Sequence, residues 1–291
     1  MNLHHLRALT AVIDEGTFEA AADVLGVTAS AVSQRIKALE TSVGQVVVRR
    51  SAPCTATEAG TVLLRMARQV QFLESEARDA LGGQPSARAV TRVAVNADSL
   101  ATWFVSVLSE AAWWPDVTLD LRVEDEGFSK KLLRQGDVIG AVTSDPAPIN
   151  GCRVQPLGSM RYLPMAAASL CERFPTNGGP DWARMPMLEF NSKDDLQQRV
   201  LRANGVAQRP PTHSIPSSDG FLAAVRAGLG WGMLPETQAH DGRSDGSLVL
   251  LMDHGHQDVA LYWQTWTLDS ERLNRLSRVI LQASRHHLRT A

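Results

Sequence analysis

The stretch from Thr28 to Glu40 constrains the fold most, because it combines two chemically opposite helical stripes. Val32, Ile36 and Leu39 recur at spacings of four and three, which places them on one helix face that must pack against a core. The opposite stripe carries hydroxyl, amide and cationic groups, which suit base edges and phosphates in the DNA major groove. Thr28 also suits the N-cap. The DNA contacts expected from this helix are Thr28, Ser30, Ser33, Gln34, Arg35 and Lys37.

A shorter helix is predicted just upstream, over residues 18–25. Thr17 precedes it as a cap and Gly26 ends it, so only a tight turn separates it from the helix that follows Thr28. Two short helices joined in this way form the helix-turn-helix pattern, whose second member enters the groove. Periodicity alone also allows an ordinary amphipathic hairpin.

The charge pattern locates the basic surface. The chain of 291 residues has 44% hydrophobic residues and a formal net charge of -2, which argues against a uniformly basic protein that coats DNA. Between residues 28 and 57, however, the sequence contains four basic residues and a single acidic residue, Glu40. Positive charge is therefore concentrated around the expected groove helix and the segment that follows it.

That following segment is predicted to be a small hairpin, or wing. Residues 46–50 favour a strand, residues 51–53 a turn and residues 55–57 a returning strand. Arg49 and Arg50 lie at the end of the first strand, where they are expected to contact backbone phosphate. The alternative is that both arginines form a solvated edge.

A long helix is expected from Glu58 to about Leu81, with apolar residues three and four apart. The helix either packs on its own domain or forms a dimer seam, and the short wing leaves little sequence to cover it, so we expect a dimer. These patterns divide the chain into a winged DNA-binding domain at 1–57, a dimerisation helix at 58–82 and a hinge at 83–90. The expected seam residues are Leu63, Met66, Val70, Leu73 and Ala77.

Beyond residue 91 strands and helices alternate, which predicts α/β units with parallel strands. We expect an effector domain of two lobes, with lobe I at about 91–150 and 266–291 and lobe II at about 151–265. The fold class is thus α/β, preceded by a winged helix-turn-helix. The main expected elements are strands at 92–95, 117–123, 138–142, 187–190, 213–215, 231–234 and 259–266, and helices at 99–112, 129–135, 196–203, 220–227 and from 270 onward.

The numbers and spacings of cysteine and histidine argue against a disulfide-rich protein and against a zinc protein. Cys54, Cys152 and Cys171 are too few and too dispersed for a disulfide framework or a zinc site. The pairs at 254/256 and 286/287 are expected to be surface histidines, since neither has partner ligands at useful spacing. No phosphate-cradling glycine motif or nucleophile elbow occurs, and no apolar run approaches membrane-spanning length. We therefore expect a cytoplasmic protein without metal, cofactor or catalytic activity, and no membrane partner.

The helix-turn-helix residues resemble a known signature. Ala20-Ala-Ala-x-x-Leu-x-Val-Thr-x-Ser-Ala-Val-Ser-x-x-Ile-x-x-Leu-Glu40 is similar to that of LysR-type transcriptional regulators. Stretches such as 95–103, 216–221 and 228–235 resemble the family's lysine- and arginine-responsive branch, and the resemblance covers essentially the whole chain. Ala29 departs from that branch, which often carries Gln there, so one base-edge contact is in doubt.

The resemblance implies a periplasmic-binding-protein-like effector domain with the ligand between its lobes. It also implies a nucleoid-associated homodimer or tetramer on double-stranded operator DNA, working with RNA polymerase and activating a basic-amino-acid exporter gene.

The expected cleft has polar groups at helix starts and strand ends. Ser99 and Ser218 would present hydroxyls and backbone N–H groups to a carboxylate, although such serines can also merely cap helices. The acids near Asp125 follow a strand, and they either form a solvated turn or bind a cation. The expected effector contacts are Asn96, Asp98, Ser99, Glu124, Asp125, Thr143, Ser217 and Ser218.

These observations favour a DNA-binding regulator that senses L-lysine or L-arginine, with L-histidine as a third candidate. The alternative is an effector-independent DNA-binding protein that acts on replication origins or DNA architecture. An enzyme on the same fold would need a nucleophile, base or cofactor motif that the sequence does not offer.

Overall fold

The N-terminal domain is a bundle of three helices in a computed structural model that describes residues 2–81, 89–115, 117–123, 126–175 and 179–290. Its helices are α1 (Leu3–Glu15), α2 (Phe18–Leu25) and α3 (Ala29–Val43). Each begins at a side-chain cap and ends at a glycine of positive φ. The caps at Thr17 and Thr28 and the end of α2 at Gly26 are as predicted. The helices pack around Leu9, Ile36 and Leu39, which are almost completely buried. The predicted helix-turn-helix is confirmed.

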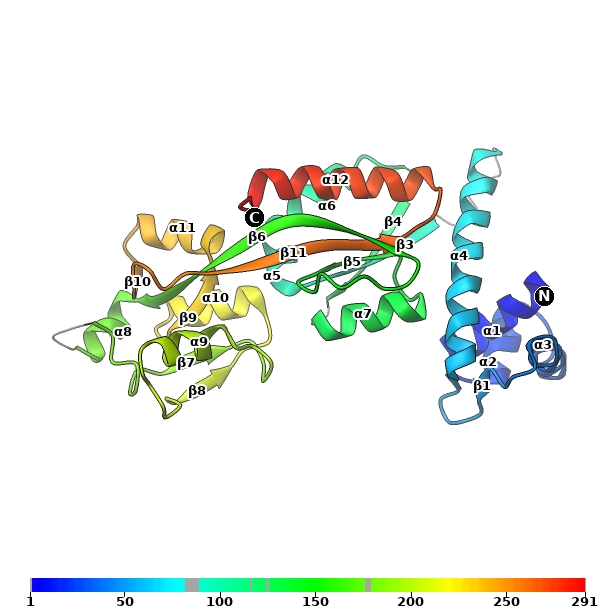
Figure 1. Cartoon of the computed structure of the whole chain (residues 1–291), viewed down its shortest axis with the longest axis horizontal. Helices are drawn as coiled ribbons and strands as arrows, with labels where there is room; N and C mark the ends of the chain where they lie inside the picture. Colours follow the sequence, from blue (N-terminus) through cyan, green and yellow to red (C-terminus); the bar gives the residue numbers. More distant parts are fainter. Residues whose placement is uncertain (1, 82–88, 116, 124–125, 176–178, 291) are drawn as a thin grey trace.

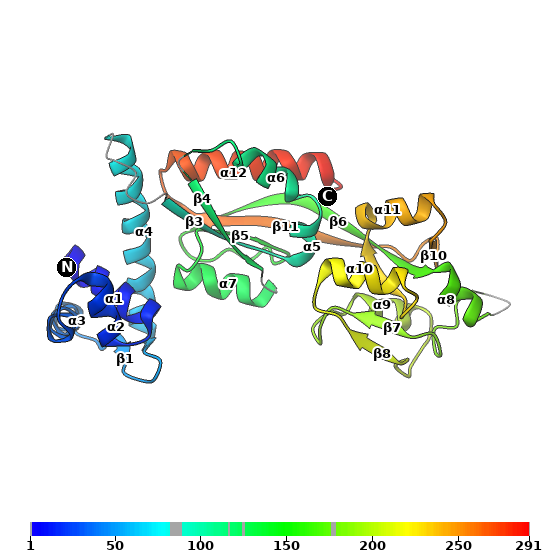
Figure 2. The same cartoon turned by 180° about the vertical axis from the view of Figure 1, so that it is seen from behind.

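The wing and the long helix follow directly. Strands β1 (Val48–Arg49) and β2 (Thr55–Ala56) pair antiparallel, and Thr57 then caps α4 (Glu58–Ala80). Leu64 and Ala67 of α4 are buried in the core of the N-terminal domain, while Phe72 is buried in the core of the effector domain. Figures 1 and 2 show α4 between the N-terminal helices and the effector domain.

Two buried arginines join α4 to the effector domain. Arg68 forms ion pairs with Asp14 of α1 and with Asp137 of the effector domain. Arg272, at the start of the last helix, donates a hydrogen bond of 2.6 Å to Asp79 of α4. Because Arg68 pairs with acids of two other elements and Arg272 donates to Asp79 and Ser75 of α4, the two guanidinium groups hold the three parts of the chain in one arrangement.

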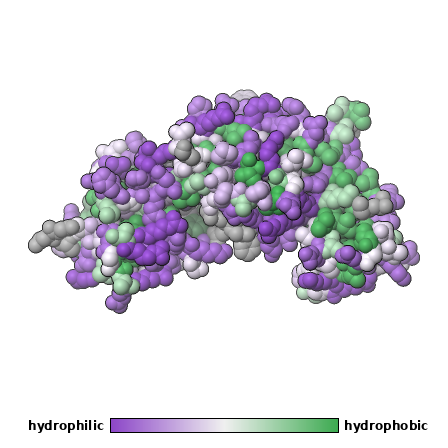
Figure 3. Space-filling view, in the orientation of Figure 1, coloured by the Kyte–Doolittle hydropathy of each residue, from purple (hydrophilic) through white to green (hydrophobic). Residues whose placement is uncertain are grey.

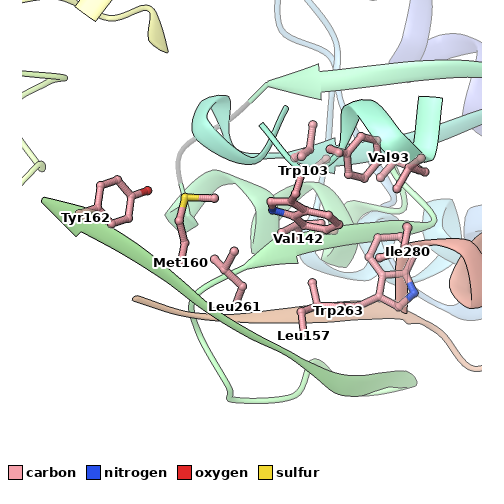
Figure 4. Packing of buried hydrophobic residues seen from close by; sticks show 14 of the residues in the cluster. Val93, Trp103, Val142, Leu157, Met160, Tyr162, Leu261, Trp263 and Ile280 are labelled. Carbon is pink, nitrogen blue, oxygen red and sulfur yellow. The ribbon is translucent and has the colours of Figure 1, made fainter. Parts of the chain in front are cut away.

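The effector domain is built around one seven-stranded sheet in the order β10-β6-β11-β5-β3-β4, with β9 also paired to β6. Lobe I contains the parallel strands of this sheet, and the helices around them cover its two faces (Figure 1). Figure 4 shows its core, where Trp103, Val142 and Trp263 lie between the sheet and the helices. The elements of lobe I are β3 (Ala89–Val95), α5 (Ala97–Ala101), α6 (Val105–Ala111), β4 (Val117–Val123), α7 (Glu126–Gln135), β5 (Gly140–Thr143) and α12 (Glu271–His287).

Lobe II is joined to lobe I by two long antiparallel strands, β6 (Cys152–Ala167) and β11 (Gln257–Trp266). Its separate pair of strands, β7 and β8, is parallel. The elements of lobe II are α8 (Ala168–Arg173), β7 (Met187–Glu189), α9 (Leu196–Ala203), β8 (Thr212–Ser214), α10 (Ser218–Arg226), β9 (Gly232–Pro235), α11 (Glu236–Ser244) and β10 (Leu248–Leu250).

The structure corrects three expectations. The single helix expected at 99–112 is wrong, because α5 starts at Ala97 and the chain bends at Thr102 before α6 begins. Buried Trp103 and Phe104 occupy this bend, so core packing interrupts the helix. The lobes also do not divide at 151 and 265, because β6 and β11 pair along both lobes. Residues 152–167, 168–173, 236–244 and 248–250, for which no element was expected, form β6, α8, α11 and β10.

The apolar residues Leu3, Leu6, Leu9 and Ile13 recur at spacings of three, three and four, which predicts one buried stripe on α1. Leu6 and Leu9 are buried as predicted, but Val12 rather than Ile13 completes the buried face, and Leu3 is exposed. Of the hinge expected at 83–90, residues 83–88 lie outside the described residues, and residues 89–90 begin β3.

Candidate functional site

The groove face of α3 is exposed in the structure. Ser30, Gln34 and Lys37 are exposed at spacings of four and three, while Ser33 and Arg35 beside them are half-buried. Thr28 is also exposed, but its side chain is engaged as the N-cap, accepting a hydrogen bond from the Ala31 N–H. The structure therefore places Ser30, Ser33, Gln34 and Lys37 on one open face of α3, whereas Arg35 lies outside that face, one residue further around the helix from Gln34.

The two arginines of the wing differ in their surroundings. Both are exposed at the end of β1, as expected. The guanidinium of Arg50 lies over the ring of Phe18, 4.7 Å from its centroid, whereas Arg49 has no partner among the described residues. This cation–π contact fixes Arg50 beside the start of α2.

The predicted seam of α4 is only partly covered within the chain. Met66 is 38% exposed and Ala77 is exposed, while Leu63, Val70 and Leu73 are half-buried. Val62, next to them, is 68% exposed. Figure 3 shows hydrophobic surface on this side of the molecule. A row of partly exposed apolar side chains is what a helix presents before it pairs with another helix.

A cavity of about 740 Å³ lies between the two lobes. This volume lies within the usual range for small-molecule sites. Its wall comes from α5 of lobe I, from β6 and β11, and from the loops and helices of lobe II. The polar and charged residues that line it are Asn96, Asp98, Ser144, Tyr162, Asn191, Lys193, Asp194, Asp195, Arg199, Ser218, Gln238 and Asp258.

Asp98 is the centre of the hydrogen bonds in this cavity. Its carboxylate accepts 2.8 Å from the Tyr162 hydroxyl and 2.7 Å from the Ser218 hydroxyl. Gln238 in turn donates 3.1 Å to the Ser218 oxygen. The contacts reach from lobe I to β6 and to lobe II, so one carboxylate connects all three parts of the cleft.

The charge of Asp98 is not balanced by a cation among the residues that the structure describes. Burial raises the pKa of this carboxyl above its usual range, and the nearby acid Asp194 adds to the increase, while the hydrogen bonds from Ser218 and Tyr162 oppose it. Asp194 accepts hydrogen bonds from the backbone N–H groups of Phe190 and Leu196. Of the four aspartates in the wall, Asp195 pairs with Arg199 and Asp258 with Arg161. Asp98 and Asp194 remain, and two such carboxylates in one cavity favour a cationic ligand.

The structure brings three of the expected effector residues into the cavity wall, namely Asn96, Asp98 and Ser218. Ser99 is not in the wall, because Asn96 caps α5 through the Ser99 N–H and the serine side chain is completely buried in the first turn. Thr143 is also buried, and its hydroxyl accepts from the Asp145 N–H. Ser217 caps α10 outside the cavity.

Glu124 and Asp125 lie outside the described residues. Sequence reasoning missed Tyr162, Asp194 and Gln238. Asp194 follows strand β7, and acids near the carboxyl end of a strand often reach the cleft. This rule could therefore have identified Asp194. Gln238 had no comparable signal, since α11 was not expected.

Two further absences concern the part of the chain that is described. No group of three or more histidine, cysteine or acidic side chains there is arranged to hold a metal ion. No helix there is long and apolar enough to cross a membrane.

Comparison with known proteins decides the family. Residues 3–61 match the bacterial regulatory helix-turn-helix proteins of the lysR family, and residues 86–285 match the LysR substrate binding domain. The chain belongs to the LysR-type transcriptional regulators. It is therefore a DNA-binding regulator with a two-lobed effector domain, as the sequence pattern indicates.

Full-length relatives resemble this regulator closely. It is 49% identical over 292 residues to the lysine export transcriptional regulatory protein LysG of Corynebacterium efficiens, with both chains fully covered. The structure of full-length LysG from Corynebacterium glutamicum with bound effector Arg matches with 46% identity and a TM-score of 0.86, covering 99% of this chain and 100% of that one. The crystal structure of ArgP from Mycobacterium tuberculosis matches with 47% identity and a TM-score of 0.90, covering 99% and 98%.

Proposed function

We propose that this LysR-type regulator binds L-lysine or L-arginine between its lobes and, in response, activates a basic-amino-acid exporter gene. The observation that carries the proposal is Asp98, a carboxylate recessed in the cavity and held by Tyr162 and Ser218 without a cation among the described residues. The names of the relatives support it, since one is a lysine export regulator and another is a regulator with bound arginine.

The charges of the cavity fit a basic amino acid. Such a ligand has an α-ammonium group and a cationic side chain, so it can neutralise both Asp98 and Asp194 while making charge-assisted hydrogen bonds. Lys193 and Arg199 lie in the same wall, where Arg199 pairs with Asp195, so the ligand carboxylate has cations within the same cavity. An uncharged amino acid of the same length would leave one of the two acids unneutralised in the cavity, which costs free energy.

The proposal assigns DNA binding and dimerisation to the N-terminal part of the chain. In this proposal residues 1–57 bind operator DNA through the exposed face of α3 and the wing, and α4 pairs with α4 of a second copy. A dimer presents two groove helices to two half-sites, and two dimers form a tetramer. The regulator acts in the cytoplasm on nucleoid DNA, contacts RNA polymerase when it activates, and performs no catalysis.

Calorimetric titration of the purified protein with lysine, arginine and norleucine tests the proposal. We expect both basic amino acids to bind more tightly than norleucine, which has a side chain similar in length to that of lysine but no side-chain cation. Footprinting on the operator should then change when lysine or arginine is added. Equal binding of lysine and norleucine would contradict the acidic cavity, and an unchanged footprint would favour a DNA-binding protein that ignores effectors.

A further inference from the structure

The C-terminal segment that follows α12 contacts both lobes of the effector domain. Residues 288–289, here called the C-terminal strap, run beside β6, where the Arg289 N–H donates 3.0 Å to the Ser159 carbonyl and the Ser159 N–H donates 2.8 Å to the Arg289 carbonyl. The Arg289 guanidinium donates to both carboxylate oxygens of Glu236, at 2.8 Å each. The strap thus joins α12 of lobe I to β6 and to the first residue of α11 in lobe II.

The shape of β6 leaves room for the strap. Gly158 has a φ of +118°, a value that favours glycine, and a Cβ at this position would lie 2.6 Å from the Arg289 carbonyl oxygen. The same hypothetical atom would lie 3.1 Å from the Leu288 Cβ. The close approach of the strap to β6 therefore depends on glycine in two ways, through its backbone angle and through its missing side chain.

Both elements that the strap contacts also reach the effector cavity. Glu236 and Gln238 lie in the first turn of α11, and Gln238 donates to the Ser218 hydroxyl that binds Asp98. Ser159 and Tyr162 lie on β6, and Tyr162 donates to the same carboxylate. The hydrogen bonds in the cavity and the ion pair of the strap are therefore attached to the same two elements. Figure 1 marks the C-terminus between α12 and the lobe that carries α11.

We propose that Arg289 is a positioning residue for the effector site, because it holds α11 against β6 in the arrangement that lets Gln238 and Tyr162 converge on Ser218 and Asp98. The residue does not touch the cavity where the effector is proposed to bind. Arg289 acts through its ion pair with Glu236. Because α12 belongs to lobe I and α11 to lobe II, this ion pair opposes a movement of one lobe relative to the other. The identity of the effector in this inference rests on the proposed function.

The test compares the charge reversals Arg289→Glu and Glu236→Arg with the double variant that carries both. Each single variant places like charges together, and we expect it to weaken lysine or arginine binding about 3- to 10-fold in calorimetry, given the modest strength of partly exposed ion pairs. The double variant should recover affinity to within about twofold of the wild type. Arg285→Glu is the matched control, because it makes the same charge change at an exposed position of α12.

A second measurement does not need the ligand. Hydrogen exchange of the full chain should become faster in β6 around Tyr162 and in the first turn of α11 in Arg289→Glu, but not in Arg285→Glu. If Arg289→Glu binds the effector as tightly as the control, the positioning role is overturned, whatever the exchange shows. If the wild type binds neither amino acid, the proposed function fails instead, and hydrogen exchange alone tests the positioning role of Arg289. Faster exchange in Arg289→Glu then supports that role, and unchanged exchange overturns it.

Discussion

The Ser218 hydroxyl donates a 2.7 Å hydrogen bond to the Asp98 carboxylate, and these two residues lie on opposite lobes of the effector domain. This hydrogen bond therefore bridges the two lobes at Asp98, and Asp98 has no cationic partner among the described residues. A basic effector supplies positive charge where the lobes meet, so its binding is expected to change the free energy of the interlobe arrangement.

Asp98→Asn should weaken binding of lysine by about 10- to 150-fold, because a hydrogen bond to a charged group contributes about 1.5–3 kcal/mol. Binding of norleucine should change little, so discrimination between the two ligands should narrow. Calorimetric titration measures both. Asp253→Asn, at an exposed position outside the cavity wall, is the control. Equal loss for lysine and norleucine would show that Asp98 does not bind the side-chain cation, and that it either contacts the α-ammonium group that both ligands carry or maintains the shape of the cavity.

Stability should depend on pH through Asp98. Burial raises the pKa of this carboxyl in the folded protein, so between its ordinary range and the folded pKa the folded state binds more protons than the unfolded state. The contribution of Asp98 to the free energy of unfolding therefore decreases as pH rises through that interval. Asp98→Asn should gain stability relative to the wild type over the same interval, which denaturant titrations from about pH 4 upward will measure. A constant difference across pH would contradict the raised pKa.

Lysine affinity should also depend on pH in that interval. A cationic effector binds the ionised carboxylate, so wild-type affinity should rise with pH until Asp98 is fully ionised, and binding should release protons. The measurement is calorimetry in buffers of different ionisation enthalpy. Asp98→Asn should lose this part of the pH dependence.

In the DNA-binding domain, Arg50→Ala should weaken binding to all sequences and reduce the salt slope by about one counterion. Ser33→Ala and Gln34→Ala should mainly relax sequence preference, because their side chains lie on the groove face of α3. Fluorescence titrations on operator and random DNA at several salt concentrations separate the two effects. Arg49→Ala is informative beside Arg50→Ala, since only Arg50 stacks on Phe18. Uniform losses from all the variants would contradict a base-reading face.

Val70→Asp should disrupt the dimer joined by α4. A carboxylate buried without a partner in a helix seam costs several kcal/mol, and Val70 lies in the partly exposed row of the helix. Analytical ultracentrifugation should detect loss of the dimer, while unchanged lysine binding would show that the effector domain remains folded. An unchanged oligomer with unchanged DNA affinity would place the interface elsewhere.

The sequence by itself determined the helix-turn-helix of the DNA-binding domain. Helices α2 and α3 begin after Thr17 and Thr28, and α2 ends at Gly26, as predicted, because caps and helical period are encoded within a few neighbouring residues. Most of the order of strands and helices in the effector domain followed for the same reason, with exceptions at α5, β6, α8, α11 and β10.

Only the tertiary structure decided which residues meet in the cavity. Tyr162 and Ser218 lie 64 and 120 positions from Asp98, and no local pattern encodes a contact at that separation. Local spacing also did not distinguish Asp98, which lines the cavity, from Ser99, which is buried beside it. That choice depends on Asn96 capping α5 two residues earlier than expected, and on β6 and β11 crossing both lobes so that the two halves of the cleft close on one acid.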